Sequence, residues 1–121
     1  CKYFLATGKD VEEQKILNTI LQSEFKDKCV KLDHLNIIDI LPIIKNCKIS
    51  ICNDSSFSHL SSAVGIQTIV LMADTPLLYG TYSPKMHPII PDGEKSVTHN
   101  TLGKSKINPD KIFSKFKEII S

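Results

Sequence analysis

The chain has 121 residues, of which 41% are hydrophobic and 23% are charged, so it is long enough to fold as one domain around its own core. Its 15 Lys and Arg residues against 13 Asp and Glu residues leave a net charge of +2, which excludes a nucleic-acid-binding protein that relies on a strongly basic surface. The aliphatic content and small net charge exclude a disordered chain, and no apolar run approaches the roughly 18 residues that span a bilayer.

The first third of the chain predicts a strand, a helix and a second strand. Residues 3–6 form a short apolar run that ends at a Thr-Gly turn. Asp10, with Glu13 three residues later, predicts an N-cap and a capping box for the helix that follows. Residues 30–32 predict the second strand. The apolar face of the helix is expected from Ile16, Leu17, Ile20 and Leu21.

The middle of the chain repeats this alternation. Apolar residues from 37 to 44 predict a helix that either tolerates Pro42 or begins after it. Residues 48–52 predict a strand, and residues 57–64 predict a helix that Gly65 closes. The continuous β-branched run at 67–72 then predicts a buried parallel strand.

The last third predicts a short strand, a loop and a final helix. Residues 88–90 are strand-like, and residues 96–106 are polar enough to be a loop. Asn108 and Pro109 supply a cap and a first-turn proline. The apolar face of the last helix is expected from Ile112, Phe113, Phe116, Ile119 and Ile120.

Strands that alternate with helices along the whole chain predict an α/β fold. The expected architecture is a Rossmann-like parallel sheet with helices on both faces, built from residues 1–121 as a single domain. The chain begins at Cys1 in a strand-like run, which predicts that it is a piece of a longer protein.

The most polar strand-to-helix junction lies at residues 53–59. In open α/β sheets, ligands bind where strands end and helices begin. Ser55 and Ser56 stand near a helix start, where free backbone N–H groups and the helix dipole favour an anion such as a diphosphate. His59 follows Ser55 by one helical turn, and Asp54 can cap the helix or accept hydrogen bonds from ligand hydroxyls. The alternative is that these residues are ordinary helix caps and that the histidine is structural.

Residues 49–84 resemble the signature region of the family-nine glycosyltransferases, the ADP-heptose:lipopolysaccharide heptosyltransferases and their relatives. The family pattern is a strand, N-D-[ST]-G-x-x-H-x-x-[AS]-A-x-G, a second strand and a loop with a Y-G-x-Y-type segment. The residues that match this pattern are Asp54, Ser55, His59, Ala63, Gly65, Thr75, Tyr79 and Gly80. The resemblance extends more weakly over nearly the whole chain.

This resemblance implies one half of a GT-B glycosyltransferase, the carboxyl-terminal half that binds the nucleotide-sugar donor. It implies that Asp54, Ser55, Ser56 and His59 contact that donor, an ADP-heptose-like substrate, with weaker candidates at Asp10, Leu35 and Thr75. The catalytic base belongs to the amino-terminal half, so no catalytic residue is expected here and the chain alone is expected to bind donor without turnover. The acceptor would be a lipid-linked saccharide such as lipopolysaccharide.

The resemblance also implies a bacterial enzyme in the cytoplasm, at the inner face of the inner membrane, with no nucleic-acid partner and at most peripheral membrane contact. No cofactor is expected beyond the nucleotide-sugar substrate. The family's usual glycine after Asp-Ser is Ser56 here. The serine side chain leaves less space than glycine for a ligand to approach the backbone, although its hydroxyl can donate a hydrogen bond to a phosphate.

Two other function classes remain open beside the transferase. One is another two-half sugar-nucleotide enzyme, such as an epimerase or a transferase with a different donor, and the other is a non-catalytic α/β binding module. A response-regulator receiver is excluded because Thr7-Gly8-Lys9 stands where it needs an acidic pair. A serine hydrolase is excluded because the G-x-S-x-G motif is missing.

The remaining polar residues predict no further site. The four cysteines lack C-x-x-C spacing, which predicts free thiols in a reducing compartment and no zinc site. No metal is expected, because His34, His87 and His99 are scattered and no D-x-D pair is present. Tyr79 and Tyr82 either line the site or pack their loop, and packing is the favoured interpretation.

Overall fold

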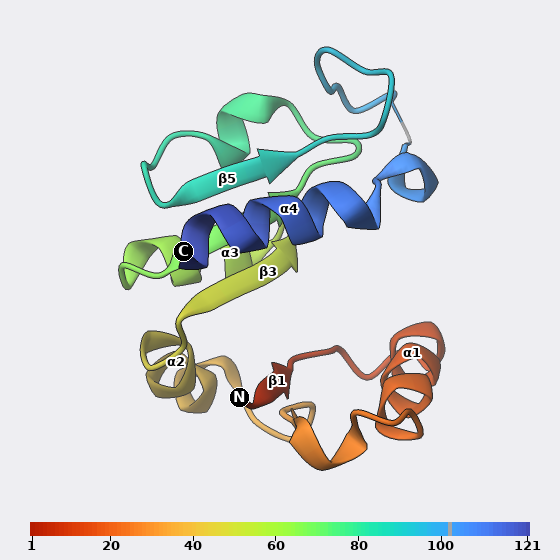
Figure 1. Cartoon of the computed structure of the whole chain (residues 1–121), viewed down its shortest axis with the longest axis vertical. Coiled ribbons are helices and arrows are strands. Elements are labelled where there is room, and N and C mark those ends of the chain that lie inside the picture. The colour runs from red at the N-terminus through yellow and green to blue at the C-terminus, as the bar shows by residue number, and fades with distance from the viewer. Residues whose placement is uncertain (102) are drawn as a thin grey trace. The chain divides into compact units, whose positions relative to one another are not determined.

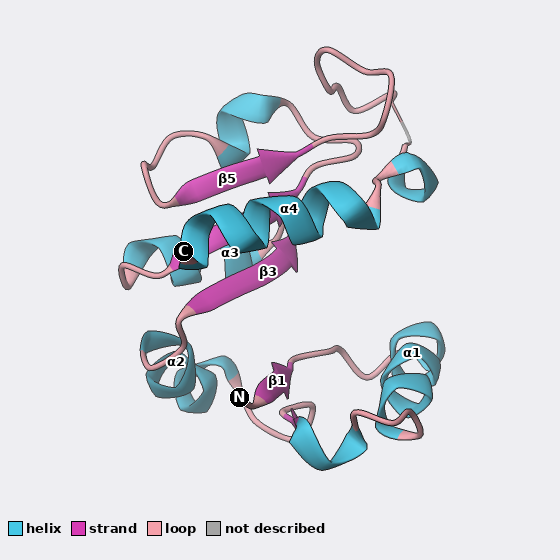
Figure 2. Ribbon diagram, in the orientation of Figure 1, coloured by secondary structure: helices cyan, strands magenta, loops and turns pink. Residues whose placement is uncertain are grey.

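The computed structural model describes residues 1–101 and 103–121, which form two compact units, Cys1–Ile40 and Leu41–Ser121. We call them the N-terminal and the C-terminal unit, and each is described by itself. Both contain parallel strands flanked by helices, so the expected α/β class is confirmed (Figure 1, Figure 2). That residues 1–121 form a single domain stays a prediction.

The N-terminal unit holds a two-stranded parallel sheet. β1 (Tyr3–Leu5) pairs with β2 (Cys29–Lys31), and α1 (Val11–Leu21) and a short 3-10 turn (Lys26–Lys28) connect them. Both strands lie within one residue of their expected positions. The small core of this unit includes Leu17, Leu32 and Ile40, each at most 4% exposed.

α1 begins where the capping signal predicts. The Asp10 carboxylate accepts a hydrogen bond from the backbone N–H of Glu13 at 2.9 Å, and this bond lowers the pKa of Asp10 below its ordinary value. The expected apolar face is only partly turned inwards, because Leu17 is buried while Ile16 is 59% exposed. Leu21 on the same face is half-buried, and Ile20 is exposed.

α2 (Ile37–Lys45) runs through Pro42 without ending. Proline has a helix-compatible φ. Because it lacks an N–H, the only helical hydrogen bond lost is the one that residue 42 would donate to the carbonyl of Ile38, four residues earlier. Because Ile38 is 74% exposed, water can satisfy that carbonyl. Asn36 caps the helix by accepting a hydrogen bond from the Asp39 N–H at 3.0 Å.

The C-terminal unit holds a three-stranded parallel sheet in the order β3-β4-β5. The strands are β3 (Ile49–Asn53), β4 (Gln67–Leu71) and β5 (Met86–Ile89). The central strand β4 is buried on both faces, since Thr68, Ile69 and Val70 are completely inaccessible. α3 (Ser56–Ala63) packs on β3 and β4, and α4 (Pro109–Ile120) on β4 and β5. In Figure 1, α4 crosses in front of these strands and α3 lies behind them.

The segment between β4 and α4 is mostly loop, as expected. It contains two short 3-10 turns, Leu77–Gly80 and Lys104–Lys106, and the expected strand at 88–90 is found slightly earlier as β5. Of the expected loop at 96–106, residue 102 lies outside the described residues. α4 starts at its proline, with Asn108 accepting a hydrogen bond from the Asp110 N–H at 2.9 Å. Its apolar face is only half covered, because Phe113 is 57% exposed.

Gly65 ends α3 as the sequence predicts. Its φ is +88°, its N–H donates to the Ser62 carbonyl at 3.0 Å, and the Ile66 N–H donates to the Ser61 carbonyl at 2.9 Å. These two bonds form a Schellman motif, which needs a left-handed residue at this position. Glycine adopts that conformation at no steric cost.

We therefore expect Gly65→Ala to destabilise the protein by about 1 kcal/mol, because a Cβ at positive φ is strained even where space is open around it. Gly65→Asn should cost less, since asparagine tolerates the left-handed region. Urea unfolding followed by circular dichroism measures both. An alanine variant as stable as the wild type would show that this backbone conformation is not required.

Candidate functional site

The turn from β3 into α3 brings the polar junction to the carboxyl end of the sheet. β3 ends at Asn53, and Ser55 is the N-cap of α3, with extended backbone angles of φ −155° and ψ 179°. The helix thus begins at Ser56, one residue earlier than expected, and Asp54 does not cap it. The reason lies in the sheet: the Asp54 N–H donates to the Leu71 carbonyl at 3.3 Å, which keeps Asp54 on the strand side of the turn.

Ser58, which the sequence interpretation passed over, holds this turn in shape. Its side chain is completely buried, and its hydroxyl donates to the Ser55 carbonyl at 2.7 Å and lies 3.4 Å from the Ser55 N–H. The sequence does contain a signal for this role, because Ser58 lies three positions after the N-cap Ser55, which is the spacing of a capping box. Glutamate or glutamine is usual at that position, so a serine there does not by itself predict a capping box.

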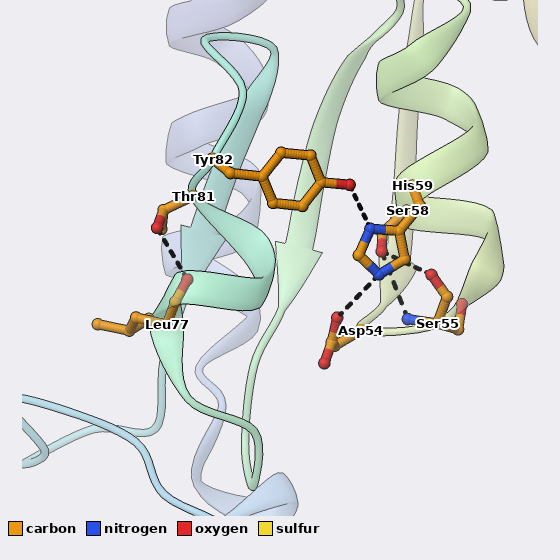
Figure 3. A network of polar contacts seen from close by, with 7 residues as sticks. All are labelled: Asp54, Ser55, Ser58, His59, Leu77, Thr81 and Tyr82. Atoms are coloured by element: carbon orange, nitrogen blue, oxygen red, sulfur yellow. Dashed lines mark hydrogen bonds and ion pairs between the residues drawn. The ribbon is translucent and has the colours of Figure 1, made fainter.

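His59 lies between an acidic and a phenolic group (Figure 3). Its Nδ1 is hydrogen-bonded to the Tyr82 hydroxyl, and its Nε2 is 3.9 Å from Asp54 Oδ1. The two rings are nearly parallel, at 8° with centroids 5.6 Å apart. Within the described part of the chain, Asp54 Oδ1 is buried without a hydrogen-bond partner, although its side chain is 13% exposed. The structure thus gathers Asp54, Ser55 and His59 as expected, and adds Tyr82.

Tyr82 belongs to the loop that leaves β4. Thr81, next to it, donates from its hydroxyl to the Leu77 carbonyl at 2.8 Å, and Gly80 sits so close to Met72 that a Cβ would come within 2.3 Å of the sulfur. The loop is therefore tied to the core beside Tyr82. Thr75 is half-buried on the same loop, and no hydrogen bond described in these residues joins it to His59.

The N-terminal unit has a polar edge of its own. Gln14 donates to the Gly8 carbonyl at 2.9 Å and to Asp33 Oδ2 at 3.2 Å, so it joins the residues that follow β1 and β2. Thr7 Oγ1 and Asp33 Oδ1 are buried and have no hydrogen-bond partner among the described residues. Sequence reasoning missed this cluster, although Thr7 and Asp33 each follow a strand.

Asp10 and Leu35 are the two weaker candidates for donor contacts in the N-terminal unit, and Asp10 has a structural role as the N-cap of α1. Its carboxylate oxygen Oδ1 caps α1 by accepting a hydrogen bond from the Glu13 N–H. Leu35 is half-buried just before α2, and its N–H donates to the Leu32 carbonyl at 3.1 Å.

Among residues 1–101 and 103–121, no group of three or more His, Cys, Asp or Glu side chains is placed to hold a metal ion. None of the helices that these residues form is both long enough and apolar enough to cross a membrane.

A parallel α/β fold with a polar strand-to-helix junction at the carboxyl end of its sheet is typical of nucleotide-binding α/β proteins. The model of glycosyltransferase family 9 (heptosyltransferase) matches residues 1–106, and this is most of the chain. The chain therefore belongs to glycosyltransferase family 9, as the resemblance of residues 49–84 indicates. No curated protein and no solved structure was found to match it.

Cys52, two residues before Asp54, carries a thiol that the fold keeps protonated. Burial raises its pKa from the ordinary 9.0 to about 11, and the negative charge of Asp54 contributes in the same direction. All four cysteines are free, and Cys1 is exposed.

We expect iodoacetamide at about pH 8 to alkylate Cys52 roughly a hundred times more slowly than an ordinary thiol, because only the thiolate reacts. Cys1 should be labelled first, and mass spectrometry of digested samples measures both rates. In urea, where burial is lost, the two rates should become similar. Equal labelling of Cys1 and Cys52 in the native protein would contradict the burial of Cys52.

Proposed function

We propose that the start of α3, together with His59, binds the diphosphate of a nucleotide-sugar donor for glycosyl transfer, and that Asp54 binds a hydroxyl of the donor sugar. The observation that carries this proposal is the position of His59 Nε2. It lies beside the first turn of α3, 3.9 Å from Asp54 Oδ1 (Figure 3). An imidazole N–H and helix N-terminal N–H groups are donors for the same anion.

The backbone supplies the larger part of this site. The first N–H groups of a helix have no acceptor within it, and the helix dipole adds partial positive charge there. Ser56 is exposed at the first helical position, so a phosphate oxygen can approach its N–H and its hydroxyl. As the sugar leaves, charge develops on the departing diphosphate, and donors that are already in place stabilise it.

Asp54 has a different part in the proposal. A carboxylate beside a diphosphate would repel it, so Asp54 is better suited to a hydroxyl of the donor sugar. Its Oδ1 is buried without a hydrogen-bond partner among the described residues, and a buried acceptor of this kind gains from a ligand donor. Thr75 stays a weaker candidate for the donor.

In the N-terminal unit, Asp10 and Leu35 stay weaker candidates for contacts with a nucleotide-sugar donor. The unpartnered Thr7 Oγ1 and Asp33 Oδ1 add two acceptors at the same end of the β1-β2 sheet, which suits a ligand rich in hydroxyl groups.

For the whole enzyme, we propose transfer of a heptose from an ADP-linked donor to lipopolysaccharide or another lipid-linked saccharide at the inner face of the membrane. Family membership supports donor and acceptor sugars in general. The catalytic base would come from polypeptide outside these 121 residues, so this chain would bind donor without turning it over.

ADP binding to the chain tests the donor site. We expect weak binding by calorimetry, and Ser56→Pro should reduce the affinity about tenfold or more. Proline is well tolerated at the first position of a helix, and Ser55 already has the extended backbone that must precede it. The substitution therefore removes the N–H at the phosphate without breaking α3. His59→Ala should lower the affinity by about tenfold or more, the value of one hydrogen bond to a charged group.

Ser56→Gly is the matched control, because it keeps the N–H and introduces the glycine usual in the family. It should bind ADP at least as well as the wild type. Absence of any ADP binding up to millimolar concentration, or equal binding by Ser56→Gly and Ser56→Pro, would sink the proposed diphosphate site.

A further inference from the structure

Tyr82 contacts His59 although the two residues are 23 positions apart in the sequence. Burial of an apolar ring does not explain where the Tyr82 side chain lies. Its side chain is 58% exposed, yet its hydroxyl is hydrogen-bonded to His59 Nδ1 and its ring lies parallel to the imidazole. The backbone beside it is fixed by the Thr81 hydroxyl and by the close approach of Gly80 to Met72. An exposed tyrosine that is held by an anchored loop and bonded to His59 indicates a role for its hydroxyl group rather than for packing of its ring.

Tyr82 at Nδ1 and Asp54 near Nε2 together favour one protonated nitrogen of His59 over the other. A neutral imidazole has one N–H donor and one acceptor nitrogen. If the Tyr82 hydroxyl donates to Nδ1, then Nε2 is the N–H, and this N–H faces the Asp54 carboxylate at 3.9 Å. In the other tautomer, the lone pair of Nε2 would face that carboxylate, which is unfavourable for a buried oxygen that lacks another donor.

The preferred tautomer is the one that suits an anion. With Nε2 protonated, His59 offers a donor beside the first turn of α3. With Nδ1 protonated, it would offer a lone pair to a phosphate oxygen, and the two would repel each other. A hydrogen bond on the far nitrogen is the usual way in which a protein fixes the tautomer of a functional histidine.

We propose that Tyr82 is a positioning residue, whose hydroxyl holds His59 as the Nε2–H tautomer and so directs an N–H donor at the donor diphosphate. This inference rests on the proposed diphosphate site for its purpose, but the tautomer itself can be measured without any ligand. Tyr82 would then act in donor binding through His59, whereas the sequence interpretation favoured a role in packing its own loop.

The test is the long-range ¹H–¹⁵N spectrum of the His59 ring at about pH 8. In the wild type, we expect Nε2 to carry the proton and the Nδ1 resonance to be displaced by its hydrogen bond. Tyr82→Phe keeps the ring and removes only the hydroxyl. In that variant, Nδ1 should move towards the value of free histidine and the second tautomer should gain population.

Tyr79→Phe is the matched control, because Tyr79 is a 49%-exposed tyrosine on the same loop whose hydroxyl takes no part in the His59 contacts. It should leave the His59 resonances unchanged. Titration with ADP gives the second readout: Tyr82→Phe should weaken binding about fivefold, the value of one ordinary hydrogen bond, while Tyr79→Phe should not.

The outcomes separate this inference from the proposed function. If wild-type His59 carries its proton on Nδ1, or if Tyr82→Phe leaves both ring nitrogens unchanged, Tyr82 does not set the tautomer. If Tyr82→Phe shifts the tautomer but binds ADP as tightly as the wild type, its part in donor binding is overturned. If the tautomer responds and the wild type binds no ADP at all, the diphosphate site fails and the positioning of His59 by Tyr82 stands.

Discussion

The sharp turn of the chain from β3 into α3 is the constraint on which the candidate site depends. The β3-β4 pairing reaches as far as the Asp54 N–H, and only two residues later Ser56 is helical. Ser55 spans this change with an extended backbone, and the buried hydroxyl of Ser58 donates to its carbonyl. The turn therefore fixes the first N–H groups of α3 at the carboxyl end of the sheet.

The neighbouring strand supplies the other half of the arrangement. β4 lies beside β3 with both faces buried, and the loop that follows it brings Tyr82 to His59. A helix start from one strand and a side chain from the next thus meet at the same edge, the place where parallel α/β sheets bind ligands. Rigid sheet pairing, with Gly80 against Met72, limits how far the two parts can move relative to each other within this unit.

The sequence predicted most elements because their signals are local. Periodic apolar residues, the Asp10 and Asn108 caps and the positive-φ Gly65 each act within one turn of the chain. α3 begins one residue earlier than the sequence predicts, because each of the consecutive polar residues 53–56 can cap a helix and the sheet pairing at Asp54 decides between them. The contact of Tyr82 with His59 depends on how strands are placed side by side, and no local pattern encodes it. The cluster at Thr7, Gln14 and Asp33 was missed for the same reason.

Amide mapping by ¹H–¹⁵N NMR during titration with ADP tests the central claim most directly, because it locates the ligand without any mutation. We expect the largest shifts on the backbone amides of residues 54–59 and smaller ones on the loop that carries Tyr82. Shifts confined to α4 or spread evenly over the chain, or a spectrum unchanged at millimolar ADP, would contradict a diphosphate site at the start of α3.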